Sequence, residues 1–382
     1  MRRYRWAVLG AGTFAQATYS AIWAGMAVMA SSLQTRYHLS LGAVGVLISA
    51  SLAGSVVSLV PWGLLADRIG ERIALLTGVG ACGVALLFAA ETHRYWTLLV
   101  FLLLAGFAGA SVQSASGRAV MYWFAPDERG LALGIRQTAI PIGGFATALA
   151  LPPIVRHGGV DWGIRTLGIA CVISAIVGWL LVRDATRDDD HVEEGPPPLR
   201  DRRIWRMSFG SALVLAPQMC VVGFTVLFLH KHRGLSTAEA AYVLAAVQVL
   251  GVGARIAAGH FSDKRGTRLR PLRAISLALT AATVVAGIVL WSPLWLTIPA
   301  LVLCGVISMS WNGLSFAAAA ELAGRARSGA AIGLQQSLLN ASGAVYPGAF
   351  GALVAATSWR IGFIAIALLP LGGWRLLRGL SG

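Results

Sequence analysis

Long apolar stretches restrict the fold of this chain more than any other feature. A transmembrane helix needs about 20 apolar residues in succession, and stretches of that length recur along nearly all of the 382 residues. Hydrophobic residues make up 57% of the chain and charged residues only 12%, against about 25% charged residues in a typical soluble domain. A soluble core cannot bury so many apolar side chains, so the sequence predicts an all-α membrane protein.

Short polar loops divide the apolar stretches into twelve predicted transmembrane helices. We place these at 7–30, 42–66, 73–91, 97–123, 131–153, 163–183, 208–229, 238–261, 271–292, 294–320, 328–355 and 358–378. The boundary between the ninth and tenth helices is the weakest, because only Trp291, Ser292 and Pro293 separate them.

The net charge of +15 follows the predicted topology and does not indicate nucleic acid as a partner. With the N-terminus placed in the cytoplasm, 21 of the 31 Lys and Arg residues fall in cytoplasmic segments and seven fall outside. An excess of this kind is the positive-inside rule. We therefore expect a multi-pass protein of the cytoplasmic (inner) membrane, surrounded by lipid bilayer, with both termini in the cytoplasm.

The two halves of the chain repeat one another. Residues 39–72 align with residues 235–268 at a constant offset of 196, without a gap. Proline and acidic runs concentrate between the halves, which is typical of a linker. The sequence thus predicts two pseudo-symmetric six-helix bundles, at 1–183 and 207–382, joined by a cytoplasmic linker at 184–206.

The repeated motifs resemble those of the major facilitator superfamily over essentially the whole chain. The family signature after the second helix is similar to G-x-x-x-D-R-x-G-x-R, which stands at 63–72, and a degenerate copy stands after the eighth helix at 259–268. Residues 123–130 resemble the family's loop between helices 4 and 5. The resemblance implies a monomeric transporter with a small-molecule substrate. The chain also lacks HExxH, GxSxG, GxxxxGK[ST] and a metal-ligand cluster, so we expect no enzyme activity, cofactor or metal.

Both copies of the motif supply candidates for gating. Gly63 and Gly259 allow neighbouring helices to approach closely. We expect Asp67 and Asp263 to lie within reach of arginines and of a helix N-terminus, whose dipole favours an anion. By resemblance the motif stabilises the outward-facing state, although these charges could instead only anchor loops. The gating candidates are Gly63, Asp67, Arg68, Gly70, Arg72, Arg129, Gly259, Asp263 and Arg268.

Arg255 is the charged residue predicted to lie deepest in the membrane. It precedes Asp263 by eight residues, about 12 Å along a helix, and ionisable residues at such depth are costly and usually functional. The pattern Arg255-x-x-x-Gly259 resembles helix 8 of nitrate, oxalate and monocarboxylate transporters of the superfamily, whose equivalent arginine binds the substrate anion. A structural arginine bound to helix carbonyls is the alternative. Arg118 and Arg136 lie nearer helix ends, where they either line the pathway or extend to the cytoplasmic face.

The predicted spans contain no Asp or Glu near their middle. Proton-coupled sugar carriers and multidrug pumps of the family usually need such a carboxylate, and residues 140–144 depart from the family's drug-antiporter motif. The oxalate carrier's second basic residue on helix 11 is missing, as is the glycine-dense nitrate signature on helix 5. We therefore predict a carrier of a small, monocarboxylate-like anion. Proton-antiport efflux of drugs or metabolites, a neutral-solute carrier and a non-transporting receptor are the alternatives.

Deep amide and aromatic side chains complete the predicted substrate site. Amides donate and accept hydrogen bonds without adding charge, although a single amide is more often a contact between helices. The substrate-binding candidates are Arg255, Gln16, Tyr19, Trp23, Gln113, Arg136, Gln137, Gln248, Trp311, Asn312, Gln336 and Asn340. The direction of transport and the coupling ion are left open.

Overall fold

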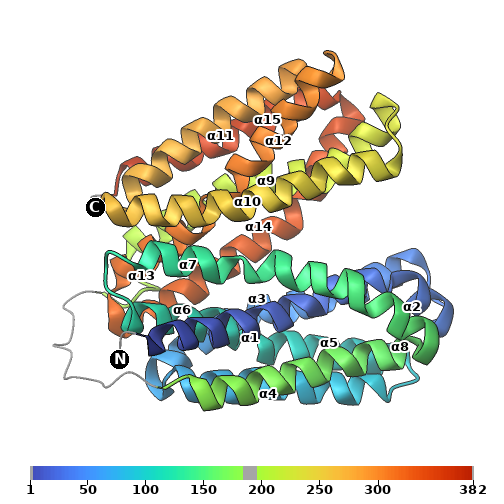
Figure 1. The fold of residues 1–382 in the computed structure, drawn as a ribbon, viewed down its shortest axis with the longest axis vertical. Helices are drawn as coiled ribbons and strands as arrows, with labels where there is room; N and C mark the ends of the chain where they lie inside the picture. Colours follow the sequence, from blue (N-terminus) through green and yellow to red (C-terminus); the bar gives the residue numbers. More distant parts are fainter. Residues whose placement is uncertain (1–2, 184–195, 381–382) are drawn as a thin grey trace. The chain divides into compact units, whose positions relative to one another are not determined.

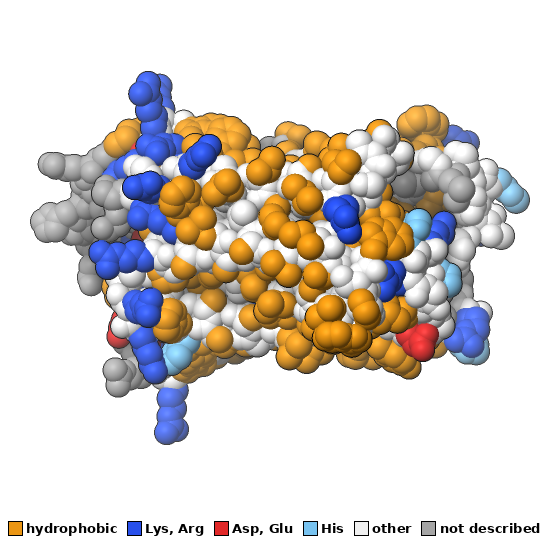
Figure 2. Space-filling view, turned by 90° about the horizontal axis from the view of Figure 1, so that it is seen from above, with side chains coloured by type: hydrophobic (Ala, Val, Ile, Leu, Met, Phe, Trp, Pro, Cys, Tyr) orange, Lys and Arg blue, Asp and Glu red, His pale blue; other side chains and the backbone are white. Residues whose placement is uncertain are grey.

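The computed structural model describes residues 3–183 and 196–380, and every regular element in these ranges is a helix (Figure 1). Ten stretches in this part of the chain are long and apolar enough to cross a membrane. One of them, Arg129–Leu181, contains 53 residues, or about 80 Å of helix, against a hydrocarbon core of about 30 Å. This stretch is broken at Gly159, where φ is 76°. On the face drawn in Figure 2, hydrophobic side chains cover the middle and most Lys and Arg gather towards one end.

The chain forms two compact units. Each consists mainly of one half of the sequence and contains a short segment from the other half. Unit 1 comprises Met1–Ala125, Arg136–Arg200 and Ala323–Ser337, and unit 2 comprises Pro126–Ile135, Asp201–Leu322 and Leu338–Gly382.

Unit 1 is built around α8, against which α1 and α4 both pack, while α3 packs against α5. Its helices are α1 (Tyr4–Val28), α2 (Ala30–Tyr37), α3 (Leu41–Ile69), α4 (Glu71–Ala90), α5 (Tyr95–Gly109), α6 (Ser111–Trp123) and α8 (Ala139–Leu181). The short helix η1 (Arg325–Arg327) and the beginning of α14 (Ser328–Ala356) also belong to it.

Unit 2 is built around α15, which packs against both α9 and α11, while α10 packs against α12. Its helices are α9 (Arg202–Arg233), α10 (Thr237–Lys264), α11 (Leu269–Val289), α12 (Leu294–Met309), α13 (Asn312–Ala323) and α15 (Trp359–Arg378). Most of α7 (Arg129–Gln137) and the remainder of α14 belong to this unit as well.

The predicted spans are found as helices, most of them longer by a few residues. Ser40 and Ser236, which occupy equivalent places in the repeat, are the N-caps of α3 and α10. Their hydroxyl groups accept hydrogen bonds from the N–H groups of Ala43 and Glu239, which satisfies donors that a helix start leaves free. The internal repeat therefore includes the signals that begin its helices.

Three features differ from the expectation. α9 begins at Arg202, inside the segment expected to be linker, and the short α2 was not expected; the part of the predicted linker at 184–195 lies outside the described residues. The spans expected at 97–123, 131–153 and 294–320 are each divided, the second at Thr138 and the third between Met309 and Asn312. At this break the N–H of Ser310 donates to Ile307, a tighter i→i−3 turn than the α-helix makes.

Candidate functional site

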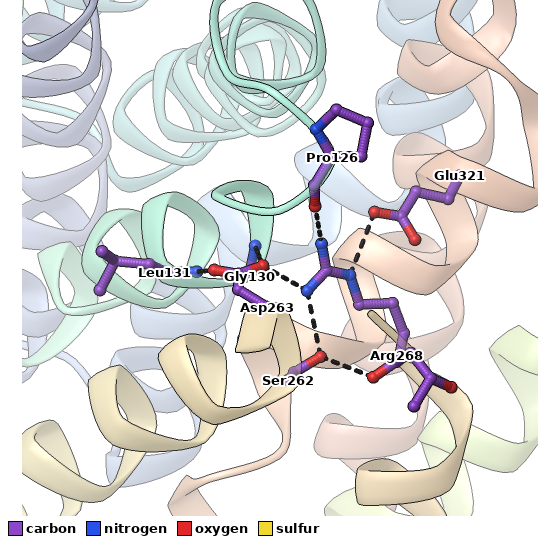
Figure 3. Close-up of polar contacts among 8 residues, drawn as sticks. Pro126, Gly130, Leu131, Ser262, Asp263, Arg268 and Glu321 are labelled. Atoms are coloured by element: carbon purple, nitrogen blue, oxygen red, sulfur yellow. Dashed lines mark hydrogen bonds and ion pairs between the residues drawn. The ribbon is translucent and has the colours of Figure 1, made fainter. Parts of the chain in front are cut away.

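Asp263, in the last turn of α10, holds the first turn of α7 (Figure 3). Its two carboxylate oxygens accept hydrogen bonds from the N–H groups of Gly130 (2.9 Å) and Leu131 (2.7 Å). These are donors that a helix start leaves unsatisfied, at the positive end of the helix dipole. Arg268 forms an ion pair with Asp263, and its Nε donates to Glu321 at 3.1 Å. The result is an Asp–Arg–Glu triad, with Asp263 and Arg268 buried and Glu321 partly exposed, that fixes α7 to unit 2.

Asp67, the equivalent residue of the first half, holds the first turn of α14 in the same way. Its carboxylate oxygens accept from the N–H groups of Gly329 (3.0 Å) and Ala330 (2.9 Å). Arg118 on α6 lies 3.2 Å from Asp67 and also pairs with the fully buried Glu71. Unit 1 therefore contains a second Asp–Arg–Glu triad at a second helix N-terminus.

The glycine of each motif copy lies directly against the backbone that its aspartate binds. A Cβ atom on Gly63 would collide with the backbone of Gly329. A Cβ atom on Gly259 would collide with the backbone of Gly130. The structure confirms the predicted close approach and the predicted contact of both aspartates with arginines and helix N-termini.

The other gating candidates lie in different surroundings. Arg72 donates from Nε to the carbonyl of Trp179 (2.8 Å), and its guanidinium lies 3.8 Å from the Trp179 ring centre. Arg68 is exposed and Arg129 is buried. Gly70 separates α3 from α4 with φ at 88°, a conformation that favours glycine.

Arg255 lies within α10 and is 2% exposed. Its Nε donates to the carbonyl of Met309 at 3.0 Å, and Met309 is the last residue of α12. The C-terminus of α12 is the negative end of its helix dipole, and it stabilises a cation at this position. The predicted deep arginine is thus buried, and one side of its planar fork bonds the carbonyl at a broken helix.

Polar side chains lie within and directly after that break, and another lies on α10. The fully buried Trp311 has an indole N–H for which the described part of the chain provides no hydrogen-bond partner. Asn312 begins α13, and its Nδ2 donates to Oε1 of Gln218 at 3.2 Å. Gln248 lies two helical turns before Arg255 on α10, and its buried Oε1 likewise has no partner among the described residues. Unit 2 therefore places two donor groups, the Arg255 guanidinium and the Trp311 indole N–H, at one helix break, and charged and neutral donors of this kind suit a small polar anion.

Arg136 is the centre of a separate buried cluster in unit 1. It is fully buried, and it donates to the hydroxyl of Ser116 (2.7 Å) and to the carbonyl of Gln113 (2.6 Å). Gln16 and Gln137 form a buried hydrogen bond of 2.9 Å. Arg136 does not extend to the surface, and Arg118 belongs to the triad with Asp67.

The remaining substrate candidates are dispersed. The Tyr19 ring lies in the core of unit 1 with its hydroxyl donating to Gly106 at 3.3 Å, a packing position. Trp23 is 42% exposed. Gln336 is buried in the part of α14 that belongs to unit 1, whereas Asn340 is half-buried in unit 2.

Sequence reasoning missed Arg118, Glu71 and Glu321 as members of the triads. All three are charged residues in or beside predicted helix ends, but nothing in their spacing indicates which arginine each carboxylate meets. It also missed the break before Asn312, because Ser310 and Trp311 are not strong helix breakers.

Together, the apolar helices, the repeated aspartate triads and the buried arginines define a polytopic helical membrane protein built from two related halves. The chain belongs to the major facilitator superfamily, whose family model matches residues 11–347. It is therefore a transporter of that family and not an enzyme.

Three comparisons illustrate the relationship. An uncharacterized MFS-type transporter of Mycobacterium tuberculosis (strain CDC 1551 / Oshkosh) is 34% identical over 382 residues, with 98% of this chain and 86% of the relative covered. A gentisate transporter of Corynebacterium glutamicum is 25% identical, with 87% and 77% covered. The solved structure of the human organic anion transporter MFSD10 has a TM-score of 0.80 at 12% identity, with 98% and 99% covered; at that identity the likeness shows the fold alone.

Proposed function

We propose that this chain transports a small organic anion, of the monocarboxylate type, across the cytoplasmic membrane by alternating access. The observation that carries this proposal is the buried Arg255, which lies within a membrane span beside a broken helix. Transporters of this kind bind substrate near the bilayer midplane, often where helices are discontinuous. A guanidinium remains charged there and presents a planar fork that matches a carboxylate.

The charge balance of the spans favours an anion over a cation. The acidic residues of the chain lie at helix ends, in loops or in the linker. Arg255 and Arg136, in contrast, are both buried within spans. A lipophilic cation would gain nothing from such surroundings, whereas an anion would offset the cost of a buried positive charge.

The comparisons support the same class of substrate. The gentisate transporter that covers most of this chain is named for an aromatic monocarboxylate. We infer that the substrate of this chain carries one carboxylate, and that Trp311, Asn312, Gln218 and Gln248 contact its remaining atoms.

We further propose twelve transmembrane helices in two six-helix bundles, at 1–183 and 207–382, with both termini cytoplasmic. The ten candidate spans do not include α1, and the break at Gly159 divides the stretch Arg129–Leu181 into two. Adding α1 and this division gives twelve, an even number, as the distribution of Lys and Arg requires. Asp67 and Asp263 would then act as gates at the cytoplasmic side.

The test is ligand-dependent stabilisation of the detergent-purified protein. Benzoate-like and aliphatic monocarboxylates, inorganic anions, sugars and lipophilic cations would be compared on the wild type, Arg255→Gln and Arg255→Lys. A ligand that binds only the folded state raises its stability by mass action, by about 2.7 kcal/mol at 100 times Kd. We expect a monocarboxylate to raise the melting temperature of the wild type, to act weakly on Arg255→Lys and to have no effect on Arg255→Gln.

The matched control is Arg360→Gln, which removes the same charge from an exposed position of unit 2 and should leave the shift intact. Carboxylate flux into proteoliposomes then separates a transporter from a receptor that only binds. If the shift survives in Arg255→Gln, or if only cations or sugars stabilise the protein, Arg255 is a structural residue and the anion proposal fails.

A further inference from the structure

Five arginines gather where three helices of unit 2 meet. They are Arg206 in the first turns of α9, Arg270 and Arg273 in the first turns of α11, and Arg375 and Arg378 at the end of α15. Because α15 packs against both α9 and α11, these helix ends lie together. Arg273 is close enough to Arg270 and Arg378 to be acted on by their charges. We call this group the basic cluster.

Two members of the basic cluster donate hydrogen bonds to backbone carbonyls and have further N–H donors besides these. Arg206 donates from Nη2 to the carbonyl of Leu376 at 3.3 Å. Arg273 donates from Nε to Leu377 at 3.1 Å and from Nη2 to Leu380. These carbonyls end α15, where cations are favoured. Each guanidinium has five N–H donors, so this capping does not use up the hydrogen-bonding capacity of the cluster.

No carboxylate among residues 3–183 and 196–380 forms an ion pair with the basic cluster. Three described acidic residues of unit 2 have other partners: Asp201 pairs with Arg203, and Asp263 and Glu321 pair with Arg268. The five positive charges are therefore not balanced by the described part of the chain.

At the corresponding helix ends of unit 1, the arginines contact aromatic rings. Arg5 lies over the ring of Phe124, Arg72 over Trp179 and Arg183 over Tyr4. Cation–π contacts of this type partly satisfy an arginine within its own chain. Among contacts with described residues, Arg378 is the one member of the basic cluster with such a contact, to Trp374 at 5.4 Å. The positive-inside rule accounts for charge at both places, but it does not account for the surplus in unit 2.

Apolar surface lies directly beside the basic cluster. Phe209, one turn beyond Arg206 on α9, is 48% exposed, and Leu277, one turn beyond Arg273 on α11, is 41% exposed. The Phe209 ring stacks on Trp205 at 5.7 Å. The surface therefore combines anion-binding groups with exposed hydrocarbon one helical turn further along, which matches the two parts of a lipid.

We propose that the basic cluster binds an anionic phospholipid with two phosphates, that is, a diphosphatidylglycerol. Arginine forks suit phosphate oxygens, and basic pockets between transmembrane helices are a known chemistry for such headgroups. Two phosphates span three helix ends and balance more of the five charges than one phosphodiester does. The acyl chains lie along Phe209 and Leu277. This inference does not depend on which solute the protein transports.

The test is native mass spectrometry of the full-length, detergent-purified protein with added diphosphatidylglycerol, phosphatidylglycerol, phosphatidylcholine or inorganic pyrophosphate. The variant is Arg270→Gln/Arg378→Gln, because both side chains are exposed and neither bonds the α15 carbonyls. At about 1 kcal/mol per surface arginine, the double variant should weaken diphosphatidylglycerol binding about 30-fold. The control is Lys231→Gln/Arg360→Gln, which removes two charges from the opposite ends of α9 and α15 and should leave binding unchanged.

Three outcomes would overturn the proposal. Equal binding of diphosphatidylglycerol by the wild type and the Arg270→Gln/Arg378→Gln variant would place the lipid elsewhere. Displacement of the lipid by equimolar pyrophosphate would indicate a site for free phosphate. Binding that appears only after the acidic residues between 184 and 195 are changed to amides would show that the linker itself occupies the cluster.

Discussion

Arg118 and Arg268 hold equivalent aspartates from non-equivalent positions. Arg118 reaches Asp67 from α6, whereas Arg268 reaches Asp263 from the residue before α11. The glutamates differ in the opposite way: Glu71 is the first residue of α4, whereas Glu321 lies on α13. Each triad therefore contains the same charges, with arginine and glutamate interchanged between the two helices that carry them.

The two carboxylates of the second triad should differ in importance. Asp263→Asn removes a buried charge that accepts two backbone N–H groups and pairs with Arg268, and breaking such a pair costs about 3–5 kcal/mol. Glu321→Gln should cost about 1 kcal/mol or less, because the Glu321 side chain is 29% exposed and its ion pair with Arg268 is partly screened. Melting temperatures of the two purified variants would check this, and a larger loss in Glu321→Gln would contradict the geometry.

Glycine at the second motif should be required for its packing and not for its helix propensity. Gly259→Ala places a Cβ atom against the backbone of Gly130, so we expect lower thermal stability and reduced transport. Gly253→Ala, on the same helix, has no neighbour within 4 Å and should be neutral or stabilising by up to about 1 kcal/mol. Similar behaviour of the two variants in melting and flux assays would argue against the close approach.

The indole N–H of Trp311 should matter to a ligand more than to the fold. Trp311→Phe removes a donor that has no partner in the described structure, so melting without ligand should change little. A hydrogen bond to a charged group contributes about 1.5–3 kcal/mol, so affinity for a bound carboxylate should fall about tenfold or more. Trp295→Phe, at a 72% exposed position, is the control. A large drop in stability with unchanged affinity would make Trp311 a packing residue.

The pair of Arg118 and Glu71 should show strong energetic coupling. Arg118→Leu deprives a fully buried carboxylate of this ion pair, so we expect a loss of about 3–5 kcal/mol. Combining it with Glu71→Leu should recover part of that loss, because the Glu71 charge is then removed together with its partner, whereas Asp67 still lacks Arg118. A double-mutant cycle of unfolding free energies measures the coupling, and simple additivity would mean that the two side chains act independently.

The helices of this chain could be predicted from sequence because lipid leaves the backbone few alternatives. A span must satisfy all its N–H and C=O groups internally, so apolar length alone locates a helix, and the repeated Ser40 and Ser236 mark where two of them begin. The contacts of Asp67 and Asp263 followed from the same repeat, since a motif at equivalent helix ends predicts equivalent surroundings.

Side-chain partners were less accessible to sequence reasoning. Arg118 was assigned either to the pathway or to the surface, because hydropathy gives depth and not the neighbouring helix. Tyr19 and Trp23 are one turn apart on α1, yet one is buried in the core and the other is exposed. Such differences depend on which helix packs on which face, and that is a property of the tertiary fold.

The hydrogen bond from Arg255 to the carbonyl of Met309 gives the guanidinium an oxygen partner within the protein itself. Under the proposed function, an anion that binds Arg255 would therefore compete with the Met309 carbonyl and would not neutralise a bare charge. The net affinity for that anion would be the difference between two favourable contacts. A carrier must release its substrate in every cycle, and competition from the Met309 carbonyl would keep the affinity for the substrate moderate.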